Sequence, residues 1–169
     1  MIIRKTVQDD IKSILDIIEE TRAYFRDEGI DQWQGEYPSR DVIERDIAAG
    51  ESYVCELDGK VCGFCAIVGG VDPSYVRIYE GEWKNSREYL ALHRVAVSSE
   101  CKGKGVAAAF VERAVSVARE QGLFDIKCDT HENNRNMRRM LEKNGFEYCG
   151  VIYLADDGAP RVAYQKIIY

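Results

Sequence analysis

The chain has 169 residues, of which 46% are hydrophobic and 31% charged, a composition typical of a globular protein with its own core. Its net charge of -6 and its pI near 5.1 argue against a nucleic-acid partner, which would require a broad basic face. No apolar run approaches the roughly 20 residues of a membrane span, and the first residues lack the apolar centre of a signal peptide, so we expect a cytoplasmic protein with no membrane partner.

The amino-terminal part of the chain is predicted to contain a strand, a long helix, a loop and a short helix. The long helix has apolar residues at helical spacing, follows Asp9 or Asp10 as a cap and ends near Gly29. Ser39 is placed to cap the short helix. The strand covers residues 2–7, the loop 30–38 and the short helix 40–49.

A β-hairpin is predicted around Asp58-Gly59, which separates the apolar runs 52–57 and 60–68. The following segment, 69–88, is rich in glycine and has no clean period, so no element is predicted in it. Insertions of this kind are usually functional or mobile.

The cysteines of this hairpin invite a disulfide or a metal interpretation. A two-residue turn would place Cys55 opposite Cys62, and a disulfide between them is conceivable, but we expect reduced thiols in a cytosolic protein. Cys62 and Cys65 form a C-x-x-C pattern, yet residues three apart in a strand point to opposite faces. We therefore expect no metal site.

The carboxyl-terminal half alternates strands and helices. Alternating apolar residues predict a strand at Tyr89–Val97, and the amphipathic helix that follows ends at Gly122. Asn133 or Asn134 is placed to cap a further helix, which extends to Lys143. The remaining strands are predicted at Leu123–Asp129, Phe146–Leu154 and Arg161–Ile168. This order, without repeat or linker, predicts one layered α/β domain.

Lys102-Gly103-Lys104-Gly105 lies between the strand at 89–97 and the next helix, and this arrangement predicts an anion site. The first amides of a helix have no internal partner, its dipole is positive at that end, and the glycines let a phosphate approach the backbone. The Walker pattern and the dinucleotide pattern G-x-G-x-x-G are both absent. A glycine-softened loop with no ligand is the alternative interpretation.

Two segments resemble motifs of the GNAT superfamily of acetyl-CoA-dependent N-acetyltransferases. Lys102–Ala107, directly after Val95-Ala96-Val97, resembles the family's pyrophosphate loop [QR]-x-x-G-x-[GA], with lysine in place of Gln or Arg. Asn134–Phe146 resembles the family's helix and turn N-x-x-A-x-x-L-Y-x-K-x-G-F. The resemblance covers essentially the whole chain and implies a single domain over 1–169. The implied fold is α/β, with a mixed, mostly antiparallel sheet of about seven strands, a V-shaped splay between strands four and five, and about four flanking helices.

The resemblance also implies that acetyl-CoA is the acyl donor and suggests its contacts. The backbone of the edge from Arg94 to Val97, with Val95, Ala96 and Val97 as its contacts, would bind the pantetheine arm, and the Val97 amide is the candidate oxyanion donor. The second motif implies contacts from Asn134, Leu141 and Lys143. The residues expected at the CoA phosphates are Lys102, Gly103, Lys104, Gly105, Val106 and Ala107.

His93 is the candidate general base, at a place that resembles that of a strand histidine in arylalkylamine N-acetyltransferases. An imidazole with an ordinary pKa near 6.5 suits this role, and a core histidine bonded to backbone is the alternative. Many family members carry a tyrosine where this chain has Leu141, which cannot protonate the leaving thiolate. Either Tyr153 or Tyr148 substitutes for that tyrosine, or the thiolate leaves unprotonated and takes a proton from water.

The acceptor pocket is expected to be built by the loop before Pro38, the irregular segment 69–88 and the last strands. His131 either faces the same cleft or helps to cap the following helix. The acidic residues of the irregular segment, Glu80, Glu82 and Glu88, are alternative bases or amine anchors. The aromatic residues that could wall an amine site, each with core packing as its alternative, are Trp33, Tyr37, Trp83 and Tyr153.

The sequence thus predicts an N-acetyltransferase that moves acetyl from acetyl-CoA to a primary amine by direct attack in a ternary complex, without a metal. A small-molecule acceptor is favoured over a protein or peptide amine, because the loops supply enough bulk to enclose a pocket. The alternative from another class is a non-catalytic acyl-CoA-binding sensor, which Leu141 favours and His93 opposes. The oligomeric state is left open, a homodimer included.

Overall fold

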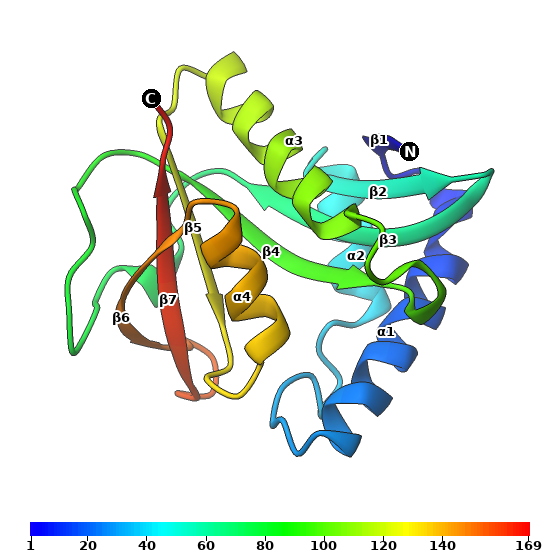
Figure 1. Cartoon of the computed structure of the whole chain (residues 1–169), viewed down its shortest axis with the longest axis horizontal. Coiled ribbons are helices and arrows are strands. Elements are labelled where there is room, and N and C mark those ends of the chain that lie inside the picture. The colour runs from blue at the N-terminus through cyan, green and yellow to red at the C-terminus, as the bar shows by residue number, and fades with distance from the viewer. The chain divides into compact units, whose positions relative to one another are not determined.

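A computed structural model describes the whole chain, residues 1–169. Figure 1 shows its strands and α-helices, which follow one another in the predicted order. They are β1 (Ile2–Lys5), α1 (Ile11–Asp27), α2 (Arg40–Ala48), β2 (Ser52–Leu57), β3 (Lys60–Val68), β4 (Leu90–Val97), α3 (Val106–Glu120), β5 (Asp125–Thr130), α4 (Arg135–Lys143), β6 (Glu147–Tyr153) and β7 (Pro160–Ile167). The strands form one mixed, seven-stranded sheet in the order β1-β2-β3-β4-β5-β7-β6, which confirms the predicted fold class.

The chain forms two compact units, which we describe one at a time. The first unit comprises Met1–Ile67 and His93–Arg113, and the second comprises Val68–Leu92 and Ala114–Tyr169. The chain passes between the units three times, at the end of β3, within β4 and within α3. The single domain over 1–169 stays a prediction.

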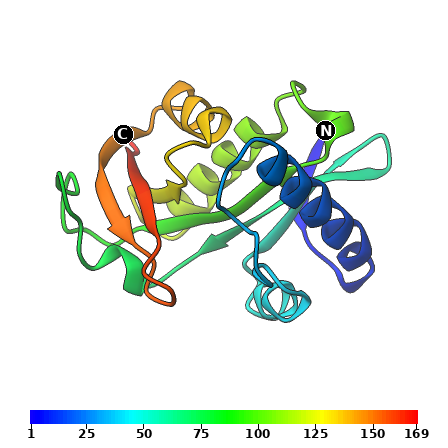
Figure 2. The same ribbon diagram turned by 90° about the horizontal axis from the view of Figure 1, so that it is seen from below.

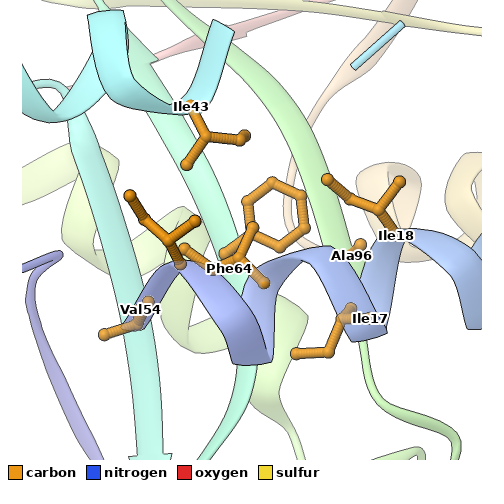
Figure 3. Close-up of a cluster of buried hydrophobic side chains, with 8 residues drawn as sticks. Ile17, Ile18, Ile43, Val54, Phe64 and Ala96 are labelled. Atoms are coloured by element: carbon orange, nitrogen blue, oxygen red, sulfur yellow. The ribbon is translucent and has the colours of Figure 1, made fainter. Parts of the chain in front are cut away.

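The core of the first unit lies where α1 and α2 cover one face of β2 and β3. Val54 and Phe64 are direct partners in the β2–β3 ladder, so their side chains share that face. Figure 3 shows Ile43 of α2 and Ile18 of α1 next to Phe64. Burying a side chain of this size contributes about 1.5–3 kcal/mol. The buried members of the cluster are Ile11, Ile14, Ile17, Ile18, Ile43, Val54, Phe64 and Ala96.

The opposite face of β3 receives the start of α3 at Gly63. A Cβ atom at Gly63 would lie 2.7 Å from the carbonyl oxygen of Ala96 and 3.1 Å from Cγ1 of Val106. Successive strand residues point to opposite faces, so Gly63 and Phe64 define the two sides of the strand. Glycine at this position lets α3 and the backbone of β4 approach β3 closely.

The β2–β3 hairpin turns at Asp58-Gly59, where both φ angles are positive, as the predicted turn requires. The predicted position of Cys55 opposite Cys62 is wrong, because the register shifts after Cys55 and this residue pairs with Gly63. The shift leaves Cys62 as an extra residue on β3, as in a β-bulge. All six cysteines are free, which agrees with the expected reduced thiols.

The second unit contains the ladder β5-β7-β6 and the start of β4. Strand β7 is antiparallel to both β5 and β6. Strand β4 runs parallel to β5, with Leu90 opposite Ile126 and Ala91 opposite Lys127. The buried residues of its core cluster are Tyr75, Tyr89, Ala91, Ile152 and Ala163.

The connection from β3 to β4, residues 69–89, is more ordered than the sequence indicated. A short 3-10 helix at Pro73–Tyr75 is capped by Asp72, whose carboxylate accepts a hydrogen bond from the Ser74 amide (2.8 Å). Tyr79 and Val151 of β6 exchange two backbone hydrogen bonds of 2.8 Å. The connection therefore runs beside the edge strand β6 (Figure 2).

Two of the three predicted helix caps are present. The Ser39 hydroxyl accepts a hydrogen bond from the Val42 amide (3.4 Å), and the Asn134 side chain accepts one from the Met137 amide (3.2 Å). Asp10 precedes α1 but its carboxylate makes no cap bond to that helix. It instead accepts hydrogen bonds from Arg4 and from the Val7 amide, so the predicted role of this side chain as the cap of α1 is wrong.

Candidate functional site

The segment Lys102–Gly105, here called the glycine loop, lies exposed at the start of α3 in the first unit. Gly103 and Gly105 have φ angles of 78° and 81°, which L side chains rarely adopt. A Cβ atom at either position would meet nothing within 4 Å, so the surface beside the loop is open. Ala109 donates to the Gly105 carbonyl (3.0 Å), and the amides before Ala109 are those that a helix start leaves without an intrahelical acceptor. This geometry suits a bound anion, and the binding of an anion at the loop stays a prediction.

Two residues of α1 hold the segment around the glycine loop. The Glu20 carboxylate accepts hydrogen bonds from the Ser99 amide (2.9 Å) and the Ser98 hydroxyl (3.4 Å). The Lys102 ammonium lies 4.1 Å from the centre of the Tyr24 ring, a cation–π distance. Glu20 and Tyr24 are four residues apart and so share one face of α1. Sequence analysis missed both residues, because their partners are distant in the chain.

Strand β4 carries the predicted catalytic and pantetheine-binding residues of the first unit. His93 is partly buried, Ala96 is buried, and Val95 and Val97 are partly buried. The Ser98 amide, just beyond β4, donates to the carbonyl of Cys62 on β3 (2.7 Å). His93, the backbone of 95–97 and the glycine loop therefore belong to one continuous segment anchored on β3.

Arg94 was predicted only as the first residue of the pantetheine-binding edge, and its side chain makes three hydrogen bonds that sequence analysis did not predict. Its Nε and Nη2 donate to the two carboxylate oxygens of Asp46 on α2, both at 2.8 Å. Its Nη1 donates to the Tyr37 hydroxyl, also at 2.8 Å. Burial by itself would lower the pKa of the guanidinium, but the charges and hydrogen bonds of Tyr37 and Asp46 outweigh burial and raise the pKa of Arg94. A charged residue inside an apolar strand was the signal available in the sequence.

The two acceptor candidates of the first unit lie in different surroundings. Trp33 packs onto the core, with its ring centroid 5.9 Å from that of Phe25 and 6.4 Å from that of Phe64. Its carbonyl accepts a hydrogen bond from Arg22 Nε (2.9 Å). Tyr37 is 45% exposed. Tyr37 thus presents its ring at the surface, and Trp33 shows the core packing that was its alternative.

The predicted CoA contacts of the second unit lie on α4. Asn134 is 7% exposed and caps the helix, and Leu141 is completely buried. Lys143 is exposed in the last turn. A buried leucine at 141 has no proton to donate, so the departure from the family's tyrosine is complete at this position. The contacts of these three residues with CoA stay predictions.

His131 and Tyr153 were predicted near the acceptor. The His131 Nδ1 atom accepts a hydrogen bond from the Asn133 amide (3.1 Å), which is the capping role given as its alternative. Tyr153 is 47% exposed, and its ring meets that of Tyr79 edge to face at 5.2 Å. Tyr148, the second acid candidate, is also 47% exposed. Both tyrosines are accessible to solvent.

Trp83 packs against residues of the second unit. Its indole nitrogen donates to the Tyr75 carbonyl (2.9 Å), and the Lys127 ammonium lies 4.1 Å from its ring centre. The same ammonium lies 4.1 Å from the Tyr89 ring centre. Burial lowers the pKa of Lys127, and the charge of Asp125 opposes this shift. Trp83 thus shows the core packing that was its alternative, and its contact with an acceptor stays a prediction.

No cluster of three or more His, Cys, Asp or Glu side chains in the structure is arranged to hold a metal ion. None of the helices combines the length and the apolar character needed to cross a membrane.

Residues 14–146 match the acetyltransferase (GNAT) family, and since this match covers most of the chain, the protein belongs to that family. The crystal structure of a GNAT-family acetyltransferase from Streptococcus agalactiae 2603 is 38% identical, with a TM-score of 0.89 over 99% of this chain and 95% of that one. The family and this neighbour confirm the resemblance seen in the two sequence motifs.

Curated relatives are more distant. The uncharacterized N-acetyltransferase YesJ of Bacillus subtilis (strain 168) is 25% identical over 147 residues, which cover 85% of this chain and 80% of YesJ. N-acetyltransferase 8F1 of Rattus norvegicus is 29% identical over 107 residues, or 63% of this chain. That match spans only 44% of the rat protein's length.

Proposed function

We propose that the protein is an N-acetyltransferase that moves an acetyl group from acetyl-CoA to a primary amine by direct attack in a ternary complex. The observation that carries the proposal is the exposed glycine loop, which opens α3 directly after β4 and lies inside the segment that matches the GNAT family. Membership in that family indicates an acyltransferase, with acetyl-CoA as the co-substrate.

The glycine loop would hold the diphosphate of CoA. Its amides and those of Val106 and Ala107 carry partial positive charge at the start of α3, and Lys102 and Lys104 add full charges. The open space beside both glycines supports this role, because a phosphate oxygen must come close to the backbone. The backbone of 95–97 would bind the pantetheine arm as an added strand does.

Acetyl-CoA supplies a thioester whose carbonyl carbon is attacked by the amine nitrogen, so that a C–N bond forms and the C–S bond breaks. The Val97 amide would donate a hydrogen bond to the developing oxyanion. His93 would accept the proton that the acceptor ammonium loses, directly or through water. Because Leu141 has no proton to give, the sulfur would take its proton from water, with Tyr153 as the side-chain alternative.

A small cationic amine is the acceptor class that we propose. The exposed Tyr37 ring offers a surface for cation–π contact in the first unit. The net charge of -6 favours the approach of a cation. A pocket enclosed by loops would exclude long peptides, so chain length of the acceptor is the variable to test.

The proposal is tested by following thiol release from acetyl-CoA and from S-acetylpantetheine, which lacks the phosphates. With small primary amines we expect turnover from both donors. Replacing both loop lysines, Lys102→Ala with Lys104→Ala, should raise the KM for acetyl-CoA about tenfold and leave that for S-acetylpantetheine unchanged. Lys12→Ala, an exposed lysine of α1 paired with Asp16, is the matched control and should change neither KM.

Three outcomes would count against parts of the proposal. Tight binding of acetyl-CoA without turnover on any amine would favour a sensor. Turnover only on peptides would replace the proposed small-molecule amine by a protein or peptide amine as the acceptor. A His93→Ala variant with unchanged kcat/KM across the pH range would remove His93 as the base, since loss of a general base costs about a hundredfold or more.

A further inference from the structure

Arg94 holds the backbone of β4 in a conformation that arginine seldom adopts. Its φ angle is 54°, in the left-handed region that favours glycine, asparagine and aspartate. Such strain persists only where the surrounding contacts fix it, and it is found most often at functional positions. Arg94 immediately follows His93 and is the first residue of the predicted pantetheine edge.

The contacts that fix Arg94 come from a rigid part of the first unit. The bidentate pair with Asp46 leaves each of the two side chains only 11% exposed. Asp46 lies one helical turn after Ile43, which is completely buried in the core cluster that contains Phe64. Helix α2 is therefore packed tightly against this core. Two hydrogen bonds between one guanidinium and one carboxylate fix the orientation of the two groups as well as the distance between them.

The backbone after Arg94 is held from the other side as well. The Ala96 carbonyl lies over Gly63 of β3, where a Cβ atom would be 2.7 Å away. The Ser98 amide donates to the Cys62 carbonyl at 2.7 Å. The segment 95–97 is therefore fixed at its start by Arg94 and at its end by β3.

We propose that Arg94 is a positioning residue, which uses its pair with Asp46 to aim the backbone groups of 95–97 at the thioester. The inference rests on the proposed function and deepens it, because it states what orients the Val97 amide, the candidate oxyanion donor. The Arg94 guanidinium also donates a hydrogen bond to the Tyr37 hydroxyl. It therefore links the segment before α2, which contains Tyr37, to the backbone of 95–97. The side chain of Arg94 touches neither reactant in this proposal.

Two substitutions at Arg94 separate the backbone conformation from the ion pair. Arg94→Asn loses the pair but tolerates the left-handed conformation, whereas Arg94→Val loses the pair and is β-branched, which disfavours it. We expect kcat to fall about tenfold in Arg94→Asn and about a hundredfold in Arg94→Val, with the KM for acetyl-CoA changed less than kcat. Asp46→Asn, which removes the carboxylate charge, should behave like Arg94→Asn.

Amide hydrogen exchange gives a readout that does not depend on activity. In Asp46→Asn the amides of 95–97 should exchange at least tenfold faster than in the unchanged protein. The matched control is Asp10→Asn, which breaks a second bidentate Arg–Asp pair in the first unit, that of Arg4 with Asp10. This control should lower the melting temperature and leave both kcat and the exchange at 95–97 unchanged.

The inference is overturned if Asp46→Asn and Arg94→Asn lower the melting temperature as Asp10→Asn does but keep the original kcat and exchange rates. Should Arg94→Val fail to fold, Tyr37→Phe is the milder variant, expected to raise exchange at 95–97 about twofold. If the unchanged protein shows no turnover with any amine, the proposed function fails, and the exchange experiment still decides the positioning role.

Discussion

Two arginine–aspartate pairs in the first unit are both bidentate but lie in different surroundings. Arg4 Nη1 and Nη2 donate to Asp10 at 2.8 Å and 3.0 Å, and the Asp10 carboxylate also accepts from the Val7 amide at 2.8 Å. This pair fastens the turn between β1 and α1, far along the chain from β4. Arg94 and Asp46 instead join α2 to a strand with a strained backbone. Identical side-chain chemistry thus serves stability in one place and, as we propose, positioning in the other.

The stability that Asp10 contributes should depend on pH. The hydrogen bond from Arg4 is the largest cause that lowers the pKa of Asp10 below 3.8, helped by the Val7 amide and opposed by burial. A carboxyl whose folded pKa is lowered contributes stability fully above its unfolded pKa, and this is lost as the pH falls through the folded value. Asp10→Asn should therefore be less stable than the unchanged protein by about 1–3 kcal/mol at pH 7, with a smaller difference below pH 3.8.

Urea unfolding of both proteins at pH 7, 5 and 3 measures this difference. A gap in unfolding free energy that stays constant over the three pH values would show that the charge of Asp10 does not matter. Lys12→Ala is a control on α1 that should show no such pH dependence below pH 5.

At the scale of elements, the β3–β4 connection is held by a buried carboxylate. Asp125 is completely buried and its Oδ1 accepts hydrogen bonds from the Asn85 amide group (2.8 Å) and from Gln165 (2.7 Å). Arg87 Nε forms an ion pair with Oδ2 at 2.8 Å. The side-chain oxygen of Gln165, Oε1, in turn accepts a hydrogen bond from the Lys84 backbone amide (2.9 Å). Three positions of a segment without regular structure are thus tied to β5 and β7.

Removing this carboxylate should loosen the connection. Asp125→Ala leaves the side chains of Asn85 and Gln165 without their shared acceptor, and we expect a loss of about 3 kcal/mol in unfolding free energy. Limited proteolysis within 77–88 should become faster, because the connection loses its anchor on the sheet. Lys84→Ala, which removes only the exposed contact of Lys84 with Glu147, should leave both measurements nearly unchanged. Equal proteolysis in both variants would contradict the anchoring role.

At the scale of the whole molecule, the chain is divided into two compact units that share three continuous elements. It crosses between them at the end of β3, after Ile67, inside β4, after Leu92, and inside α3, after Arg113. Intact elements through all three boundaries favour cooperative unfolding of the two units. The family match likewise extends across both, from residue 14 to residue 146.

Thermal unfolding should therefore show one transition, by circular dichroism and by tyrosine fluorescence alike. Acetyl-CoA at about 100 times its Kd should add about 2.7 kcal/mol, because the ligand binds the folded state alone. For a chain of this length, that shift corresponds to a rise in Tm of about 5–11 °C. Two separated transitions would contradict the single domain, and an unchanged Tm would contradict acetyl-CoA binding.

The sequence predicted the regular elements well because their signals are local. The cap residues Ser39 and Asn134 and the hairpin turn Asp58-Gly59 act through hydrogen bonds and φ angles that neighbouring residues determine. The register after Cys55 was missed, since a bulge on β3 depends on how the whole strand packs. The two family motifs predicted the glycine loop and α4, because each motif lies within a short stretch of sequence.

By itself, the sequence determined the element order, the fold class and the family, because hydrophobic period, turn residues and short motifs all operate within a few residues. Tertiary structure decided which side chains meet. The bidentate pair of Arg94 with Asp46 joins positions 48 residues apart. Asp125 accepts hydrogen bonds from Asn85 and Gln165, each of which lies 40 residues away along the chain. No local pattern encodes such contacts, since they follow from the packing of α2 against the strands and of the β3–β4 connection against β5 and β7. The strained backbone at Arg94 is likewise a product of that packing.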